Sequence, residues 1–173
     1  WNGGAAYQID LQGPTGRKIV TRKDDGTNIT FTWGSLSSAQ KTLIDSPNAA
    51  SGSSPILDFL RGDHTNEIQQ GGTLRQRTAN SALGDIIHSR PFYVSDTNKV
   101  DGTINAAPAP TVFVGANDGM LHAINVATGQ ERWAYIPSML IDKIKNLAVT
   151  PYVHDYYVDG SVSVGNILSS TKR

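Results

Sequence analysis

The sequence predicts a mainly β protein with a few short helices. Three observations carry this expectation. Turn-forming residues are frequent, with 17 glycines and 8 prolines; charged residues make up only 17% of the chain; and short β-branched and aromatic runs recur between turn signals. Helical bundles need many lysines and glutamates on their surfaces, whereas turn-rich sheets do not. A length of 173 residues allows one domain and argues against three.

Residues 1–34 are predicted to form a lead-in β-hairpin segment. Residues 6–11 alternate between apolar and polar side chains, as a half-buried strand does. The runs 18–21 and 28–33 flank Asp25-Gly26, and Asp-Gly between β-rich runs is a strong hairpin signal because glycine takes the positive φ of tight turns. The acidic turn suggests a calcium site as the alternative. No further oxygen ligands follow at loop spacing, so a plain turn is favoured.

Residues 35–110 are predicted to form a segment of short helices and loops that enters the sheet. Ser35 or Ser37 can cap a helix over 39–44, and Pro55 can begin a second helix that continues to residue 60. The remaining features of the segment are strand-like runs at 86–87 and 92–94 and a long loop at 96–110.

Residues 111–173 are predicted to hold one blade of a β-propeller, a helix and the start of a next blade. Three strand-like runs are joined by tight turns, and such a β-meander is the unit from which propeller blades are built. The predicted strands are 111–115, 120–126 and 131–136, followed by a helix over 137–147 and another hairpin over 156–165.

Composition excludes several classes of function. The formal net charge is zero and both signs are spread evenly, so we expect no basic surface for nucleic acid or an anionic membrane. The absence of cysteine excludes disulfides, thiolate metal sites and a cysteine nucleophile. No apolar run approaches the roughly 20 residues that cross a bilayer, so no membrane-spanning segment is predicted. The start at Trp1 suggests a processed or trimmed chain.

Residues 112–133 resemble the blade repeat of propellers typified by quinoprotein dehydrogenases. In that repeat an Asp-Gly pair closes the first hairpin, a Thr-Gly pair closes the second, and a tryptophan packs between blades. The matching positions here are Asp118, Gly119, Thr128, Gly129 and Trp133. Such a repeat indicates a propeller blade and by itself says little about function.

Further blocks on both sides of the blade make the resemblance more specific. Roughly residues 30–168 resemble the C-terminal domain of the PilC/PilY family, the type IV pilus assembly and tip-adhesin proteins. The resemblance implies a partial, modified β-propeller, because a closed propeller needs at least four blades and this chain has one full blade. The blocks, in order, are Phe59 to Asp63, Leu74 to Arg77, Leu83 to Pro91, Trp133 to Ser138 and Tyr156 to Ser161.

The expected function is that of a binding and assembly module rather than an enzyme. The resemblance implies an exported protein at the pilus tip, the bacterial cell surface or the outer membrane. It implies roles in pilus extension, surface attachment and twitching motility, with major and minor pilins and a host-cell receptor as partners. The alternatives are a fragment of a quinoprotein-type dehydrogenase, which the absent cysteines and the single blade disfavour, and an outer-membrane assembly scaffold.

One candidate site is an adhesion tripeptide. Arg61-Gly62-Asp63 is the sequence that integrins read when an exposed loop presents it to the metal of the receptor. The alternative is a structural role, in which Arg61 pairs with Asp63 at a helix end and Gly62 caps the helix.

A second candidate is a metal site. Asp96, Asn98 and Asp101 are the nearest match to the calcium loop that the resemblance implies for the full family domain. Their spacing does not fit a loop that offers oxygens at alternate positions and a terminal bidentate acid. No cofactor is therefore expected within this chain. The four histidines also lack metal-ligand spacing; they are His64, His88, His122 and His154.

Overall fold

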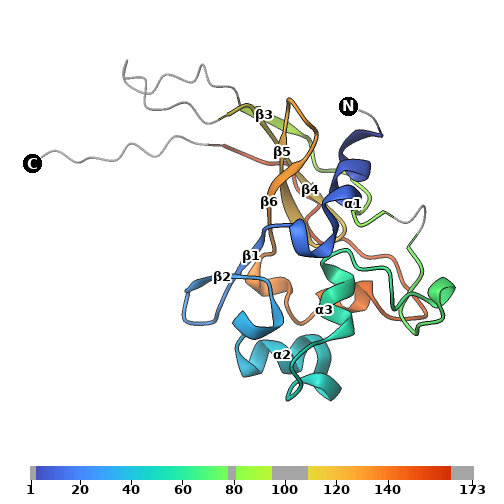
Figure 1. Ribbon diagram of the computed structural model, residues 1–173. Coiled ribbons are helices and arrows are strands. Elements are labelled where there is room, and N and C mark those ends of the chain that lie inside the picture. Colours follow the sequence, from blue (N-terminus) through green and yellow to red (C-terminus); the bar gives the residue numbers. More distant parts are fainter. Residues whose placement is uncertain (1–2, 78–80, 95–108, 165–173) are drawn as a thin grey trace, which may run out of the picture.

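The computed structural model describes residues 3–77, 81–94 and 109–164 (Figure 1). One six-stranded sheet runs through these residues in the order β2-β1-β6-β5-β4-β3. Short helices lie beside it and below it, with α2 and α3 together at one end. The predicted fold class, mainly β with a few short helices, is confirmed.

The last four strands form a continuous antiparallel meander. Each pairs with the next strand in the sequence, so the run predicted at 92–94 is the first strand of the same blade. Four antiparallel strands make one complete propeller blade. The pair at 86–87 lies outside any strand and is exposed, so its strand prediction is wrong. The strands are β3 (Phe92–Val94), β4 (Thr111–Ala116), β5 (Met120–Asn125) and β6 (Glu131–Tyr135).

The predicted hairpin around Asp25-Gly26 is confirmed as β1 (Ile19–Arg22) and β2 (Asn28–Thr30). Strand β1 also pairs with β6, and this pairing is parallel. The Thr21 hydroxyl extends it by donating to the carbonyl of Ile136 at 2.8 Å, across 115 residues of sequence. The lead-in segment thus shares a sheet with the blade, while the division at residues 34 and 110 stays a prediction.

Helix α1 (Gly4–Gly16) replaces the strand predicted at residues 6–11. Ile9 is fully buried, whereas Tyr7 and Leu11 are exposed, so the alternation does not mark a sheet face. The helix is instead fixed by side chains that reach other parts of the backbone: the carboxylate of Asp10 accepts from the amide of Ala82 at 2.8 Å. Tertiary contacts therefore override the local pattern.

Helices α2 (Ser38–Asp45) and α3 (Pro55–Leu60) form where the sequence predicts them. Ser37, not Ser35, caps α2, and its hydroxyl accepts from the amide of Gln40 at 3.2 Å while the Gln40 side chain accepts from the amide of Ser37. Ser54 caps α3 by accepting from the amide of Leu57 at 3.1 Å. Among the described residues, no helix has the length and apolar character that crossing a membrane requires.

The helix predicted over 137–147 is wrong in detail, because two short 3-10 helices occupy this stretch. Their amides bond to carbonyls three residues back, a tighter winding than in an α-helix. The side chains of Ile141, Ile144 and Leu147, spaced by three, then face the main core. The 3-10 helices are η1 (Trp33–Ser35), η2 (Ser46–Asn48), η3 (Ile68–Gln70), η5 (Ser138–Leu140) and η6 (Ile144–Leu147).

The hairpin predicted over 156–165 is not formed in its described part, because residues 151–164 contain no strand; residue 165 lies outside the described residues. Side-chain contacts hold this segment against the blade: Lys143 pairs with Asp155 at 2.7 Å, and Asn117 accepts from the amide of Tyr157 at 3.1 Å. The segment passes β4 so closely that a Cβ at Gly115 would lie 2.3 Å from the carbonyl oxygen of Val158. Glycine at this position therefore permits the contact.

Candidate functional site

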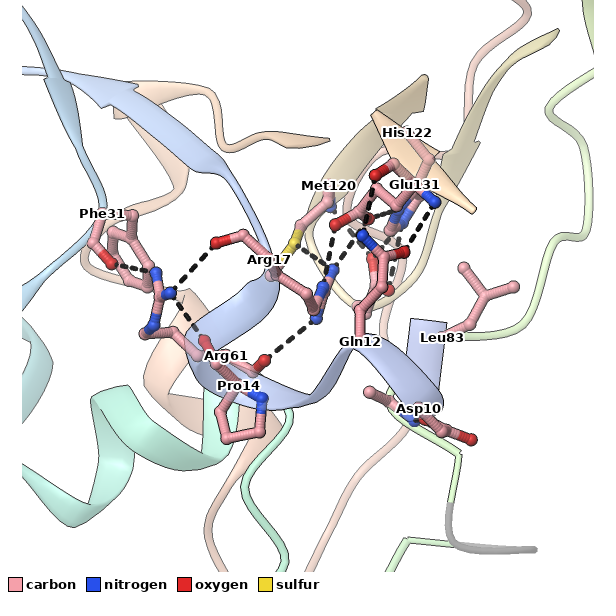
Figure 2. A network of polar contacts seen from close by, with 12 residues as sticks. Asp10, Gln12, Pro14, Arg17, Phe31, Arg61, Leu83, Met120, His122 and Glu131 are labelled. Carbon is pink, nitrogen blue, oxygen red and sulfur yellow. Dashed lines mark hydrogen bonds and ion pairs between the residues drawn. The ribbon is translucent and has the colours of Figure 1, made fainter. Parts of the chain in front are cut away.

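A buried network of charged side chains joins the end of α1 to the blade (Figure 2). Arg17, His122 and Glu131 are all buried. The Nε and Nη2 atoms of Arg17 donate to the two carboxylate oxygens of Glu131 at 2.8 and 2.9 Å. His122 lies between two acids, with Nδ1 at 2.7 Å from Glu131 and Nε2 at 3.1 Å from Asp118. Positive and negative groups thus alternate along the network.

The network sets the charge states of its members. Burial by itself would lower the pKa of His122, but the charges and hydrogen bonds of Asp118 and Glu131 outweigh it and raise the pKa to about 9. Burial would likewise raise the pKa of Glu131, but His122 and Arg17 lower it to about 2. At neutral pH His122 and Glu131 are therefore both charged, and each has a partner of opposite sign, as buried charges require.

Gln12 attaches α1 to the start of β6. Its amide nitrogen donates to the carbonyl of Glu131 at 2.9 Å, and its amide oxygen accepts from the amide of Glu131 at 2.7 Å. One side chain thus replaces a neighbouring strand at this point of the sheet. These two bonds fix the end of α1 against the sheet.

Arg61 of the adhesion tripeptide is part of the same internal structure. It caps the C-terminus of α3, and Gly62 follows with a φ of 107°. Its guanidinium donates to the carbonyls of Phe31 at 2.7 Å, Pro14 at 2.6 Å and Arg17 at 3.1 Å (Figure 2). The predicted turn role of Gly62 fits this geometry. The guanidinium faces the protein.

Asp63 is held differently, and the local pairing with Arg61 that we considered is not formed. Its carboxylate accepts from the amide of Thr65 at 2.7 Å, and its carbonyl accepts from the guanidinium of Arg77. Arg77 is itself ion-paired with the buried Glu67 at 2.7 Å. The tripeptide therefore has a fixed backbone, and its carboxylate is the more accessible of its two charged groups.

The geometry of the Asp118-Gly119 turn explains why an aspartate and a glycine suit these two positions of the blade motif. Asp118 accepts from the amides of Met120 at 3.1 Å and Gly84 at 3.0 Å, so it closes the turn and binds a neighbouring loop. Gly119 has a φ of 89°, and a Cβ there would lie 2.9 Å from Cδ1 of Ile144. Side chains rarely adopt this backbone conformation, so glycine suits the position.

The second turn of the blade motif also lies where the sequence predicts it. The hydroxyl of Thr128 accepts from the amide of Gln130 at 3.3 Å, and Gly129 has a φ of 75°. Trp133 contacts Phe113 in a tilted arrangement with ring centroids 5.8 Å apart. The role of Trp133 between blades stays a prediction.

The metal candidates Asp96, Asn98 and Asp101 lie outside the described residues. Within the described ranges, no group of three or more histidine or acidic side chains could hold a metal ion. Calcium in the longer family domain remains a prediction.

Sequence reasoning missed the network of Arg17, His122 and Glu131. Arg17 lies 114 residues from Glu131, so no local pattern joins the two. The sequence did carry a signal for the pair of His122 and Glu131. Strands β5 and β6 form a hairpin, and its register places Ile124 opposite Glu131. His122, two residues before Ile124, shares its face of the strand, and this diagonal neighbour was predictable.

Comparison with known proteins agrees with the geometry of the blade. Residues 83–172, just over half of the chain, match the family described as the PilY1 beta-propeller domain. The type IV pilus biogenesis factor PilY1 homolog of Xylella fastidiosa (strain Temecula1) is 37% identical over 133 residues, which are 68% of this chain and 11% of the relative. The type IV pilus biogenesis factor PilY1 of Pseudomonas aeruginosa (strain PAK) is 33% identical over an alignment covering 96% of this chain and 16% of the relative.

No solved structure matches the chain significantly. The chain spans only a small part of the curated relatives, at most about a sixth of their length in these two alignments. The family match nonetheless covers the blade, its turns and the segment that follows it. The four-stranded meander and the match together confirm the predicted partial propeller, and this chain belongs to the PilY1 beta-propeller family.

Proposed function

We propose that this chain is a non-enzymatic module of a type IV pilus biogenesis factor, which supports pilus extension, surface attachment and twitching motility. The observation that carries the proposal is the similarity of nearly the whole chain to a PilY1 protein named as such a factor. We propose major and minor pilins as partners, with a host-cell receptor as a further one. The module then acts outside the cell, at the pilus tip, the cell surface or the outer membrane.

The described structure supports a load-bearing role. The Arg17–Glu131 pair and the two hydrogen bonds of Gln12 tie α1 to the start of β6, and β1 pairs with the same strand further along it. Separating these elements requires breaking buried charge-assisted bonds, which are stronger than ordinary hydrogen bonds. Loops around such a sheet keep their positions when a pilus pulls on them.

The test is carried out in the bacterium that makes the full-length protein. Removing the codons for residues 3–164 is expected to reduce surface pili and the twitching zone to the level of a gene deletion, as measured by shearing, immunoblotting and stab assays. A matched strain carries only Lys18→Met, an exposed change expected to leave both readouts intact. Unchanged pili and motility in the deleted strain would refute the proposal.

We also propose that the module is not an enzyme and that this chain holds no resident cofactor. A separate assay tests this. Purified protein mixed with pyrroloquinoline quinone, calcium and an alcohol is expected to reduce no dye. Turnover above that of a heat-denatured sample would favour the dehydrogenase alternative instead.

We propose that any attachment through Arg61-Gly62-Asp63 depends on the carboxylate of Asp63. Asp63→Ala is expected to lower binding to integrin-coated surfaces while leaving the fold intact, because the lost contact with Thr65 is exposed. Arg61→Ala is expected to destabilise the protein by roughly 2 kcal/mol, because three carbonyls lose a charged donor. Adhesion assays and thermal unfolding separate the two effects. Equal adhesion by the native protein and Asp63→Ala would exclude the tripeptide as the attachment site.

A further inference from the structure

A cavity of about 270 Å³ opens between the end of α3, the β4–β5 turn and the segment after η6. Its volume is close to the lower end of the range of small-molecule sites, so only a compact ligand or one side chain fits. None of the adhesion or blade-motif side chains lines it except Asp118. Among its polar and aromatic lining residues are Arg75, Asp85, Asn117, Tyr152 and His154.

Arg75 is held rigidly at this cavity. Its Nε donates to the carbonyl of Leu147 at 2.7 Å, and its backbone amide donates to the carbonyl of Ala148 at 2.8 Å. Its guanidinium lies 4.0 Å from the ring centroid of Tyr152 and 5.9 Å from that of Phe59. A cation fixed in this way loses little side-chain freedom when it binds a ligand.

The terminal nitrogens of Arg75 are unused within the described structure. No described residue accepts a hydrogen bond from Nη1 or Nη2, and no described carboxylate forms an ion pair with this side chain. Arg77, two residues along the chain and also at the cavity, is the contrast. All three of its guanidinium nitrogens donate, to Glu67, Phe59 and Asp63. Arg77 therefore stabilises the fold, whereas Arg75 keeps a donor edge that no described residue uses.

A carboxylate with spare capacity also lines the cavity. Asp85 accepts from Asn117 and from His154 at 3.0 Å each, and both bonds end on the same oxygen, Oδ2. Besides these two bonds and one from its own backbone amide, no described residue donates to this carboxylate. Asp118 differs, because the amides of two residues and the imidazole of His122 occupy its two oxygens. The cavity thus offers one cationic donor edge and one anionic acceptor.

We propose that the cavity binds a small ligand with a carboxylate, which Arg75 holds through its two terminal nitrogens, and with a donor group that reaches Asp85. The planar guanidinium matches the geometry of a carboxylate and can bind it bidentately. A ligand that also carries an ammonium group balances both charges, as a free α-amino acid does. The same carboxylate chemistry is available from an acidic side chain of a partner protein. This proposal does not depend on the pilus role.

The test is a titration of the labelled 173-residue protein by NMR, which follows the backbone amide signals of Gly84, Asp85 and Asn117 at the cavity, signals that every variant retains. The probes are acetate, glycine and the capped peptide acetyl-Gly-Glu-Gly-amide. Arg75→Gln is expected to weaken binding of every probe by roughly tenfold or more, because charge-assisted bonds are lost. Arg90→Gln removes an exposed arginine away from the cavity and is expected to leave binding unchanged.

A second variant keeps the proposal testable if Arg75→Gln perturbs the fold. Asp85→Asn leaves Arg75 in place and removes the negative charge, so it is expected to strengthen acetate binding and weaken glycine binding. If glycine binds more tightly than the peptide, the ligand of the cavity is a free amino acid. If the peptide binds more tightly, the ligand is an acidic side chain of a partner protein. No saturable shift with any probe, or binding equal in native protein and a folded Arg75→Gln, would overturn the proposal.

Discussion

Replacing Arg17 with methionine is expected to lower the free energy of unfolding by about 3–5 kcal/mol, the range for removing one partner of a buried ion pair. The change takes two donors from the carboxylate of Glu131, which is buried at 3% exposure and cannot turn to water. It also removes the hydrogen bond from Arg17 to the carbonyl of Arg61 at 3.2 Å. Urea unfolding followed by tryptophan fluorescence measures the loss.

The matched control is Lys18→Met, which changes the same charge to the same side chain one position away. Lys18 is exposed, so its loss is expected to cost less than about 0.5 kcal/mol. A double variant, Arg17→Met with Glu131→Gln, should be less destabilised than the sum of the single variants, because the orphaned charge is gone. Equal losses for Arg17→Met and Lys18→Met would show that the network does not stabilise the fold.

Raising the pH from 6.5 to about 9 is expected to lower the free energy of unfolding by about 3 kcal/mol, since each unit of pKa shift corresponds to about 1.4 kcal/mol. The folded state keeps the proton of His122 up to a pKa of about 9, whereas an ordinary histidine releases it near 6.5. Stability from this group is therefore complete below pH 6.5 and is lost as the pH rises through 9. Urea unfolding at a series of pH values measures how steeply the free energy of unfolding changes with pH.

His122→Gln provides the control for this slope. Glutamine can still form a hydrogen bond with Glu131, but it does not titrate. We expect the variant to be less stable than the native protein at pH 6.5 and nearly as stable at pH 9. The charged groups facing residue 122 are Asp118 and Glu131, with Arg17 behind Glu131. A slope of the same size in His122→Gln would assign the pH dependence to other groups.

At the acidic end the sign is opposite. The pKa of Glu131 is lowered to about 2 in the folded state, from an ordinary value of 4.5. Its contribution is complete above pH 4.5 and is lost as the pH falls through 2. The same contacts with His122 and Arg17 underlie both pKa shifts, so the two contributions are not additive. The contributions of both groups are complete only between about pH 4.5 and pH 6.5, so the protein should be most stable in that range.

Short-range signals predicted the parts of the fold that short-range chemistry controls. Asp25-Gly26, Asp118-Gly119 and Thr128-Gly129 lie at the turns that the sequence indicates. Ser37 caps α2 through the adjacent Gln40, a contact contained within four residues. Such motifs carry their own geometry, so they appear in the same place whatever surrounds them.

Predictions failed where distant contacts decide the local structure. Residues 6–11 alternate like a strand, but Asp10 and Gln12 bind the backbone at Ala82 and Glu131, which holds the segment as a helix. Residues 156–164 contain a turn signal, yet Lys143 and Asn117 hold the neighbouring backbone in place of a second strand. The conformation of both segments depends on partners that no local window contains.

The amino-acid sequence by itself determined the blade, its turns and its family resemblance, because hairpins and meanders join residues close along the chain. Only the tertiary structure decided that β1 adds to the blade in parallel, that Arg61 faces inward, and that Arg17, His122 and Glu131 share one buried network. The physical reason is that burial makes each charge depend on a partner, and Arg17 and Glu131, the pair that joins α1 to the blade, are 114 residues apart in the sequence.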